Sequence, residues 1–241
     1  MLFRSFDLQV RNTAKISAIK PLKLEFVLNE FIKPYPVQFK GSAWARSLLK
    51  LLGWKATFHG LPALQGVAVV YPHTSNWDAP LMFLVKFALG IQVSFWGKDK
   101  IFKWPLIGRW LRWIGGVPVN RTAAGGVVGE AVRLIESHKA AKTYFWLGLA
   151  PEGTRKLIPG WRSGFYQTAL RADVTLLVVK LDYGTKTVSI VDFINLTGNI
   201  EADMARISSM YTGVKGFHPE LASPVQILDP SLSRQDMVVK S

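Results

Sequence analysis

The sequence of 241 residues contains no cysteine and only four histidines, and its acidic residues are few. The lack of cysteine excludes a disulfide scaffold, a zinc ribbon and a thiol nucleophile. Four histidines argue against a metal site built from several imidazoles. Because 49% of the residues are apolar, the chain is not globally disordered. Its length predicts a single domain with a core of ordinary size.

The sequence contains thirty Lys and Arg and sixteen Asp and Glu, which gives a formal net charge of +14. The charge is concentrated in two segments: residues 1–55 carry +7 and residues 98–121 carry +5. Two local basic surfaces are therefore expected. A surface of this kind fits a polyanionic partner, which is a nucleic acid, a phosphorylated substrate or an anionic membrane.

No apolar run is long enough to cross a bilayer. The first residues lack the apolar core of a signal peptide. The longest near-apolar run, 79–97, contains Lys86 and is interrupted by Gly90. Because a spanning helix needs about 20 apolar residues without a central charge, this run predicts a buried helix followed by a strand. We expect a protein that is cytosolic or bound to a membrane from its cytosolic side.

Two segments, 43–54 and 99–114, combine apolar residues at helical spacing with nearby Lys and Arg. The spaced apolar residues are Trp44, Leu48, Leu51 and Leu52 in the first segment, and Phe102, Leu106, Trp110 and Trp113 in the second. The pattern is typical of an interfacial membrane helix and also of an amphipathic helix packed on its own core. The spacing alone favours the packed helix. Four of the nine Trp within 18 positions favour the membrane.

The chain divides into a basic N-terminal region, 1–54, and an α/β domain, 55–241. Residues 1–42 predict an arm of one or two short helices, followed by the amphipathic, membrane-binding helix at 43–54. From residue 55 strand and helix patterns alternate, which predicts a mixed, largely parallel sheet flanked by helices. Strands are expected at 66–72, 91–96, 117–120, 143–149, 174–180 and 187–192, and helices at 78–89, 99–114, 126–139 and 201–211. The helix at 99–114 contains Pro105, where it can break.

His73 and Asp78 lie five residues apart, after the strand at 66–72 and at the start of the helix at 78–89. This spacing can bring the carboxylate to one imidazole nitrogen, so that the other nitrogen takes a proton. The nucleophile can then be a hydroxyl of the substrate. The alternative is a histidine in a turn with Asp78 as the N-cap of the helix. The spacing alone favours this alternative.

Two further motifs also follow predicted strands. After the strand at 143–149 come Glu152, Gly153, Thr154 and Arg155. Gly153 permits an unusual backbone angle, and Thr154 and Arg155 can donate hydrogen bonds to an oxyanion or a phosphate. Arg121 ends the strand at 117–120. Taken singly, these motifs are also compatible with a strand-end turn and with solvated charges.

In this order, the His-x4-Asp pair, the strand-end Arg and the Pro-Glu-Gly-Thr-Arg run resemble the glycerolipid acyltransferase family. This family contains the 1-acylglycerol-3-phosphate and lysophospholipid acyltransferases. The resemblance runs from about Leu48 to Asp192. It includes the Lys-rich stretch 97–108 that leads to Arg121, and the Trp-Arg-Ser-Gly-Phe stretch at 161–165.

The resemblance implies transfer of an acyl chain from acyl-CoA or acyl-carrier protein to the hydroxyl of a lysophospholipid, first of all 1-acylglycerol-3-phosphate, giving phosphatidic acid. It implies that His73 is the general base and that Asp78 orients it. The substrate phosphate would be held by Lys98, Arg121, Glu152, Gly153, Thr154 and Arg155. No metal and no cofactor beyond the acyl carrier is implied. The implied location is the cytoplasmic face of the inner membrane, on anionic lipid and without nucleic acid.

The sequence departs from the family pattern at three positions. Thr175 stands where the fourth block usually has Pro, Pro72 opens the first block, and Asp99 follows Lys98. These departures favour a divergent subgroup with another acceptor, which is a different lysophospholipid, glycerol-3-phosphate or a lyso amino-acid lipid. The alternative of another class is a non-catalytic basic module that binds membranes or nucleic acid. That alternative predicts nothing about His73 or residues 152–155.

Overall fold

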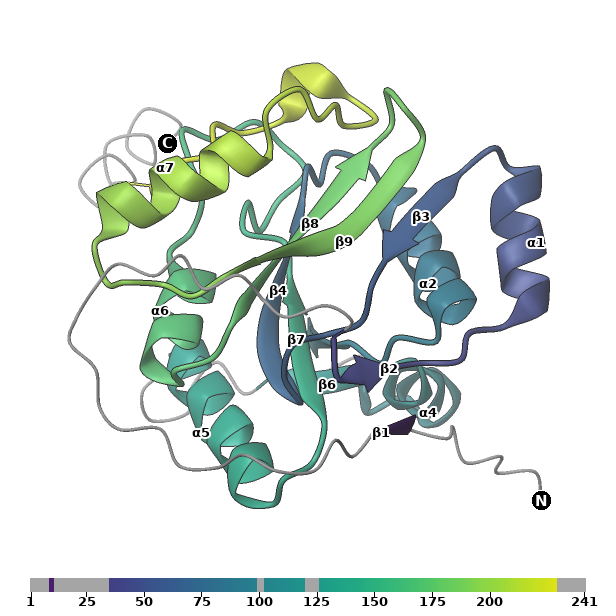
Figure 1. Ribbon diagram of the computed structural model, residues 1–241, viewed down its shortest axis with the longest axis horizontal. Helices are drawn as coiled ribbons and strands as arrows, with labels where there is room; N and C mark the ends of the chain where they lie inside the picture. The colour runs from purple at the N-terminus through teal and green to yellow at the C-terminus, as the bar shows by residue number, and fades with distance from the viewer. Residues whose placement is uncertain (1–8, 11–34, 99–101, 120–125, 229–241) are drawn as a thin grey trace.

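The computed structural model describes residues 9–10, 35–98, 102–119 and 126–228 (Figure 1). Its centre is a seven-stranded sheet in the order β3-β9-β8-β4-β7-β5-β6. The strands are β3 (Lys55–Phe58), β4 (Gln65–Tyr71), β5 (Ser94–Lys98), β6 (Gly116–Val119), β7 (Phe145–Leu149), β8 (Leu176–Asp182) and β9 (Thr187–Ile194). All neighbours are parallel except β8 and β9, which form an antiparallel hairpin. The mixed, largely parallel sheet is therefore confirmed.

Helices cover both faces of this sheet (Figure 1). They are α1 (Ala43–Leu51), α2 (Asp78–Leu89), α4 (Pro105–Trp113), α5 (Gly126–Ala140), α6 (Gly164–Arg171), α7 (Ile200–Met210) and the short 3-10 helix η1 (Pro219–Leu221). Outside the main sheet, β1 (Gln9–Val10) pairs antiparallel with β2 (Val37–Gln38). No helix in the described part of the chain has the length and apolar character needed to span a bilayer.

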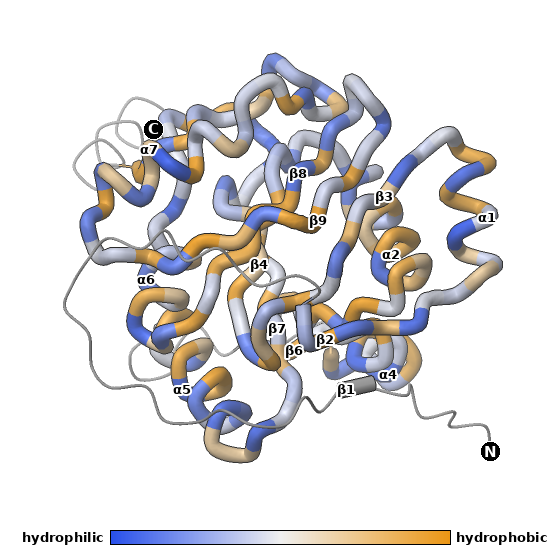
Figure 2. The backbone as a smooth tube through the Cα atoms, viewed as in Figure 1, coloured by the Kyte–Doolittle hydropathy of each residue, from blue (hydrophilic) through white to orange (hydrophobic). Residues whose placement is uncertain are grey.

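The central strand β4 shows why the sequence forms two hydrophobic clusters. Successive side chains of a strand point to opposite faces of the sheet. Val67 and Val69 accordingly join the cluster under α5, α6 and α7, whereas Ala68 joins the cluster under α1 and α2. Because both faces are covered, the strand is a continuous apolar run. Figure 2 shows the hydrophobic central strands between the helix layers.

The helix predicted at 43–54 is packed on the α/β core by one of its faces. Ala45 and Leu49 of α1 are buried in the cluster that also contains Val85 of α2. The Ser42 side chain accepts a hydrogen bond from the Ala45 N–H and caps the helix. A Cβ at Gly41 would lie 1.9 Å from the Ala88 carbonyl oxygen, so this close approach needs glycine. The division of the chain at residue 54 stays a prediction.

Several expected elements differ from those observed. Within the helix expected at 99–114, α4 begins at Pro105, where a break was expected, because proline lacks an N–H and fits the first helical turn. Residues 99–101 lie outside the described residues. Phe102, expected to share a face with Leu106, is instead buried. The strand expected at 91–96 begins at Ser94. The short elements β3 and α6 lacked a sequence pattern strong enough to predict them. The helices expected within 1–42 lie largely outside the described residues, and the described part contains β1 and β2.

Candidate functional site

The predicted motifs meet at one edge of the sheet. Strands β4, β7, β5 and β6 are neighbours and run parallel, so their carboxyl ends lie side by side. The loop containing His73 follows β4, and the loop at 152–155 follows β7. Lys98 is the last residue of β5. Its side chain and the whole of Arg121 lie outside the part of the chain that the structure describes.

His73 and Asp78 form a hydrogen-bonded pair. The Nδ1 of His73 lies 3.0 Å from Asp78 Oδ2, and the same oxygen accepts the backbone N–H groups of Thr74 and Ser75 at 2.9 Å. Asp78 is buried. A carboxylate held in this way selects the tautomer with the proton on Nδ1 and leaves Nε2 of His73 for a substrate. The alternative role of Asp78 as the N-cap is wrong, because α2 begins at Asp78 and Trp77 occupies the cap position.

The environment of Asp78 favours its ionised form. Burial by itself would raise the pKa of this carboxyl, but hydrogen bonds from His73, the Ser75 backbone and Tyr183 lower the pKa below its ordinary value. The Tyr183 hydroxyl donates to Asp78 Oδ1 at 2.8 Å. Tyr183 was not predicted as a site residue, because it lies in the turn between β8 and β9, far from Asp78 in the sequence.

Glu152 fixes the backbone around His73. Its side chain is 1% exposed, Oε2 accepts the His73 N–H at 2.7 Å, and Oε1 accepts the Ser223 N–H at 2.9 Å. Burial raises the pKa of Glu152, although the two hydrogen bonds oppose that rise. The resemblance implies that Glu152 contacts the substrate. Because both oxygens are occupied by the backbone, we assign it instead to positioning the His73 loop.

The rest of the 152–155 loop places cations near the surface. Gly153 has φ +63°, a left-handed conformation that favours glycine, and a Cβ there would lie 3.0 Å from the Arg162 side chain. The Thr154 hydroxyl accepts the Lys156 N–H at 3.2 Å. Arg155 and Arg162 are both exposed. Two guanidinium groups are thus available around this loop, of which only Arg155 was predicted to bind substrate.

A segment far along the chain completes the site. The His218 N–H donates to Thr74 Oγ1 at 3.1 Å, and the Tyr71 hydroxyl donates to the Ser223 carbonyl at 2.9 Å. A Cβ at Gly216 would lie 2.7 Å from Thr74 Oγ1, so the backbone runs directly against the His73 loop. These contacts span more than a hundred residues and left no local pattern in the sequence.

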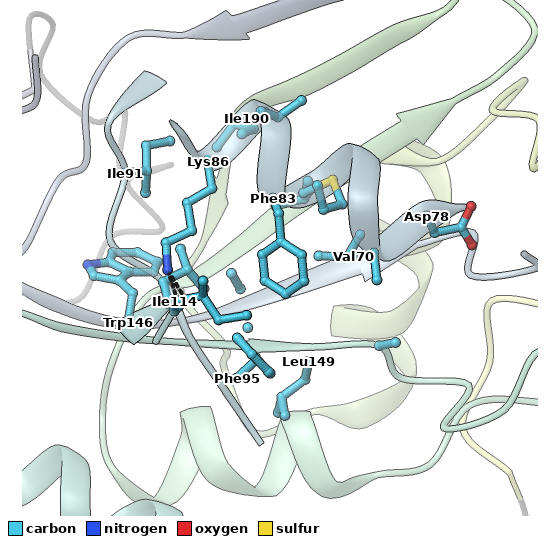
Figure 3. Close-up of a pocket in the computed structure, with 18 of the residues that line it drawn as sticks. Val70, Asp78, Phe83, Lys86, Ile91, Phe95, Ile114, Trp146, Leu149 and Ile190 are labelled. Atoms are coloured by element: carbon cyan, nitrogen blue, oxygen red, sulfur yellow. Dashed lines mark hydrogen bonds between the residues drawn. The ribbon is translucent and has the colours of Figure 1, made fainter. Parts of the chain in front are cut away.

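An apolar cavity of about 480 Å³ extends from the His73–Asp78 pair beneath α2 (Figure 3). Its lining includes Val70, Phe83, Phe95, Ile114, Trp146 and Leu149. Figure 3 shows Asp78 at one side of the cavity and Lys86 toward the other, with Phe83 between them. The cavity is therefore long, apolar and adjacent to the candidate general base.

Lys86 is a cation in the wall of this cavity. Its Nζ donates to the carbonyl oxygens of Val93 at 3.0 Å and Ile114 at 2.5 Å. Figure 3 shows dashed hydrogen bonds at the Lys86 Nζ beside Ile114. Burial lowers the pKa of Lys86 to about 8. The lysine that interrupts the apolar run in the sequence thus ties the segment before β5 to the end of α4. Among the described residues, no three His, Cys, Asp or Glu side chains gather as metal ligands.

Comparison with known proteins identifies the family of this chain. The family model described as Acyltransferase matches residues 55–181, which is more than half of the chain, so the chain belongs to that family. No curated protein matches the sequence significantly. The structure is similar to the crystal structure of the 1-acyl-sn-glycerophosphate (LPA) acyltransferase PlsC from Thermotoga maritima. The two sequences are 18% identical, the match covers 69% of this chain and 73% of the other, and the TM-score is 0.45.

Proposed function

We propose that this acyltransferase moves an acyl chain from acyl-CoA or acyl-carrier protein to the free hydroxyl of a lysophospholipid. The first acceptor to test is 1-acylglycerol-3-phosphate, which would give phosphatidic acid. The observation that carries the proposal is the His73–Asp78 pair, joined at 3.0 Å beside a long apolar cavity. The site thus offers a group for proton transfer, His73, beside an apolar space for an alkyl chain.

In the proposed reaction, Nε2 of His73 takes the proton of the acceptor hydroxyl while its oxygen attacks the thioester carbonyl carbon. The resulting tetrahedral intermediate collapses, the carbon–sulfur bond breaks, and the thiolate takes the proton from the imidazolium. Asp78, whose pKa is lowered, remains ionised and stabilises the imidazolium. No side chain of the protein becomes acylated in this sequence of steps.

The substrates are assigned to the site by their chemistry. The apolar cavity beneath α2 suits the acyl chain, because burying methylene groups stabilises the complex by about 0.8 kcal/mol each. The cations at Arg155 and Arg162 suit the acceptor phosphate, and we assign Lys98 and Arg121 to the same role. Because the lysophospholipid acceptor and its phospholipid product reside in membranes, we propose that the protein works on the cytoplasmic face of the inner membrane. Residues 1–54 would be the membrane-associating region and 55–241 the catalytic domain.

The test is acceptor-dependent release of thiol by the purified full chain in detergent. Acyl-CoA and acyl-carrier protein should each be crossed with 1-acylglycerol-3-phosphate, other lysophospholipids, glycerol-3-phosphate and a lyso amino-acid lipid. We expect His73→Gln to lower turnover by about 10²- to 10⁴-fold, whereas His59→Gln, at an exposed histidine, retains it. Turnover that survives His73→Gln, or no acceptor-dependent turnover with any pair, would contradict the proposal.

A further inference from the structure

Lys86 places a charged group in the part of the cavity that lies away from the catalytic pair. Among the described residues, the lining of the cavity is apolar or aromatic except at His73, Asp78 and Lys86. Lys86 follows Asp78 by eight residues on the same helix, α2. Because eight residues of an α-helix span about 12 Å, the ammonium group is well separated from the reacting atoms. The proposed mechanism does not use it.

The Lys86 side chain extends into the cavity. Figure 3 shows it running from α2 with its nitrogen toward Ile114 and away from Asp78. Its Nζ is held there by the carbonyl oxygens of Val93 and Ile114. A Cβ at Gly115 would lie 2.8 Å from Nζ, so any larger residue at that position would press on the ammonium. The position of the charge is therefore well defined.

The ammonium group has one donor left over. It carries three N–H groups, and the two carbonyl oxygens accept two of them. In the described part of the chain, no carboxylate forms an ion pair with Lys86. Burial lowers the pKa of Lys86 to about 8, so the group is still mostly protonated at pH 7. A cation in an apolar cavity without a counter-charge is costly, and an oxygen atom of a ligand at the third N–H would reduce that cost.

A lysine that links two carbonyl groups does not have to stand in a cavity. Lys139 of α5 makes the same kind of link, to the carbonyl oxygens of Ala172 at 2.9 Å and Asp173 at 3.2 Å. Lys139 is exposed, so water can accept its third N–H. The third N–H of Lys86 instead faces an apolar space. Linking two segments is thus common to both lysines, whereas only Lys86 is placed to contact a molecule in the cavity.

The group that suits this donor is a neutral oxygen on an alkyl chain. The side chains of Ile91, Phe95 and Trp146 line the same cavity, and the Trp146 indole N–H is already bonded to the Ala63 carbonyl at 3.1 Å. A plain alkyl chain would leave the third N–H of Lys86 without an acceptor. A hydroxyl on the chain would accept it and would itself avoid burial without a partner. A carboxylate would add the desolvation cost of a second charge.

We infer that Lys86 forms a subsite for a hydroxyl group in the middle of the acyl chain, so that the enzyme selects acyl groups hydroxylated at that position. The inference rests on the proposed function, because it takes the cavity as the place of the acyl chain. It concerns the chemistry of the chain at one position and not the length of the chain.

The experiment compares three acyl groups of equal length on the carrier that supports turnover, CoA or acyl-carrier protein. They are hexadecanoyl, 3-hydroxyhexadecanoyl and 10-hydroxyhexadecanoyl. The first hydroxyl lies close to the thioester, and the second is far enough along the chain to reach Lys86. We expect kcat/KM of the unmodified full chain to be highest for the 10-hydroxy group. A preference that does not depend on where the hydroxyl stands would overturn the inference, and this comparison needs no variant.

Lys86→Met removes the donors and keeps an unbranched side chain. The ratio of kcat/KM for the 10-hydroxy group to kcat/KM for the plain group should fall at least about tenfold, because a hydrogen bond from a charged group is lost. The matched control is Lys139→Met, which removes a lysine with the same kind of carbonyl contacts outside the cavity and should leave the ratio unchanged. If Lys86→Met changed the preferred chain length and left this ratio as it was, Lys86 would only limit the cavity and the inference would be wrong.

Binding without turnover separates this inference from the proposed function. Free 10-hydroxyhexadecanoic acid should raise the unfolding temperature of the unmodified chain more than hexadecanoic acid does, and Lys86→Met should abolish the difference. If this difference were found in a chain that transfers no acyl group, the proposed function would fail and the hydroxyl subsite would stand. Turnover with equal use of the plain and the 10-hydroxy group would refute the subsite alone.

Discussion

The hydroxyl of Tyr183 donates a 2.8 Å hydrogen bond to Asp78 Oδ1 across 105 residues of sequence. The Tyr183 ring is itself held edge-on by Trp54, with ring centroids 4.9 Å apart, and by Phe217, at 5.3 Å. Burial and the neighbouring Asp78 carboxylate raise the pKa of Tyr183, so the phenol remains a donor. Tyr183 is therefore a positioning residue for the His73–Asp78 pair.

Tyr183→Phe keeps the ring and removes the donor. We expect kcat to fall by about tenfold, because a hydrogen bond to a charged group contributes about 1.5–3 kcal/mol. With one donor fewer, the pKa of Asp78 should rise, because the Tyr183 hydrogen bond contributes to lowering it. Since the ionised Asp78 supports the reaction, the acid limb of kcat/KM should move to higher pH. A pH–rate profile identical to that of the unmodified enzyme would remove Tyr183 from the site.

Glu152→Gln distinguishes positioning from substrate contact. The amide offers one acceptor oxygen where two buried N–H groups, of His73 and Ser223, need acceptors. An unsatisfied buried N–H costs about 1–3 kcal/mol, so we expect a lower unfolding midpoint and a fall in kcat of about tenfold or more. Glu201→Gln on α7 serves as the control. A change confined to the acceptor KM would instead place Glu152 against the substrate.

Arg155→Ala and Arg162→Ala test the phosphate site. Each should raise the KM of a phosphate-bearing acceptor by about tenfold, since a charge-assisted hydrogen bond contributes about 1.5–3 kcal/mol. The KM for the acyl donor should change less. Steady-state kinetics with both substrates varied provides the comparison. An unchanged acceptor KM in both variants would mean that other groups hold the phosphate.

Lys86→Met tests the buried cation by its effect on stability. The pKa of Lys86 is about 8 in the folded protein, below its ordinary value of 10.5. Between these two values the unfolded chain binds more protons, so stability should rise as pH rises from 8 toward 10. Because the group is partly open to the cavity, we expect a gain of only about 1 kcal/mol.

Urea unfolding at pH 7.5 and pH 9.5 measures this difference, where these pH values bracket the lower pKa of about 8. The Lys86→Met protein should lack this part of the pH dependence. If both proteins showed the same dependence, the ammonium would not be the group that titrates.

Much of the fold follows from local pattern. The helix at 78–89 was predicted with its observed bounds, because Gly90 adopts φ +76° and stops it and the apolar run precedes that glycine. The buried strand β4 was equally visible, since a strand covered on both faces is apolar throughout. His73 and Glu152 were predicted at one edge of the sheet because each follows a parallel strand.

The partners of those residues were not predictable in the same way. Tyr183 and Ser223 reach the site from turns and loops, where nothing in the neighbouring sequence reports a distant hydrogen bond. Phe102 shows the limit of helical spacing: it matches the face of Leu106 in register, yet it precedes α4 and is buried. Which apolar residues a helix buries depends on what lies against it.

The segment at 216–223, which packs against Thr74 and Glu152, also determines when the candidate site can be completed during synthesis. A ribosome delivers the His73 loop early and Glu152 in the middle, but the Ser223 N–H that occupies the second Glu152 oxygen comes last. Until then Glu152 Oε1 lacks the donor that it has in the folded protein. The nascent chain therefore contains His73, Asp78 and Glu152 well before it can form the complete set of hydrogen bonds that positions them.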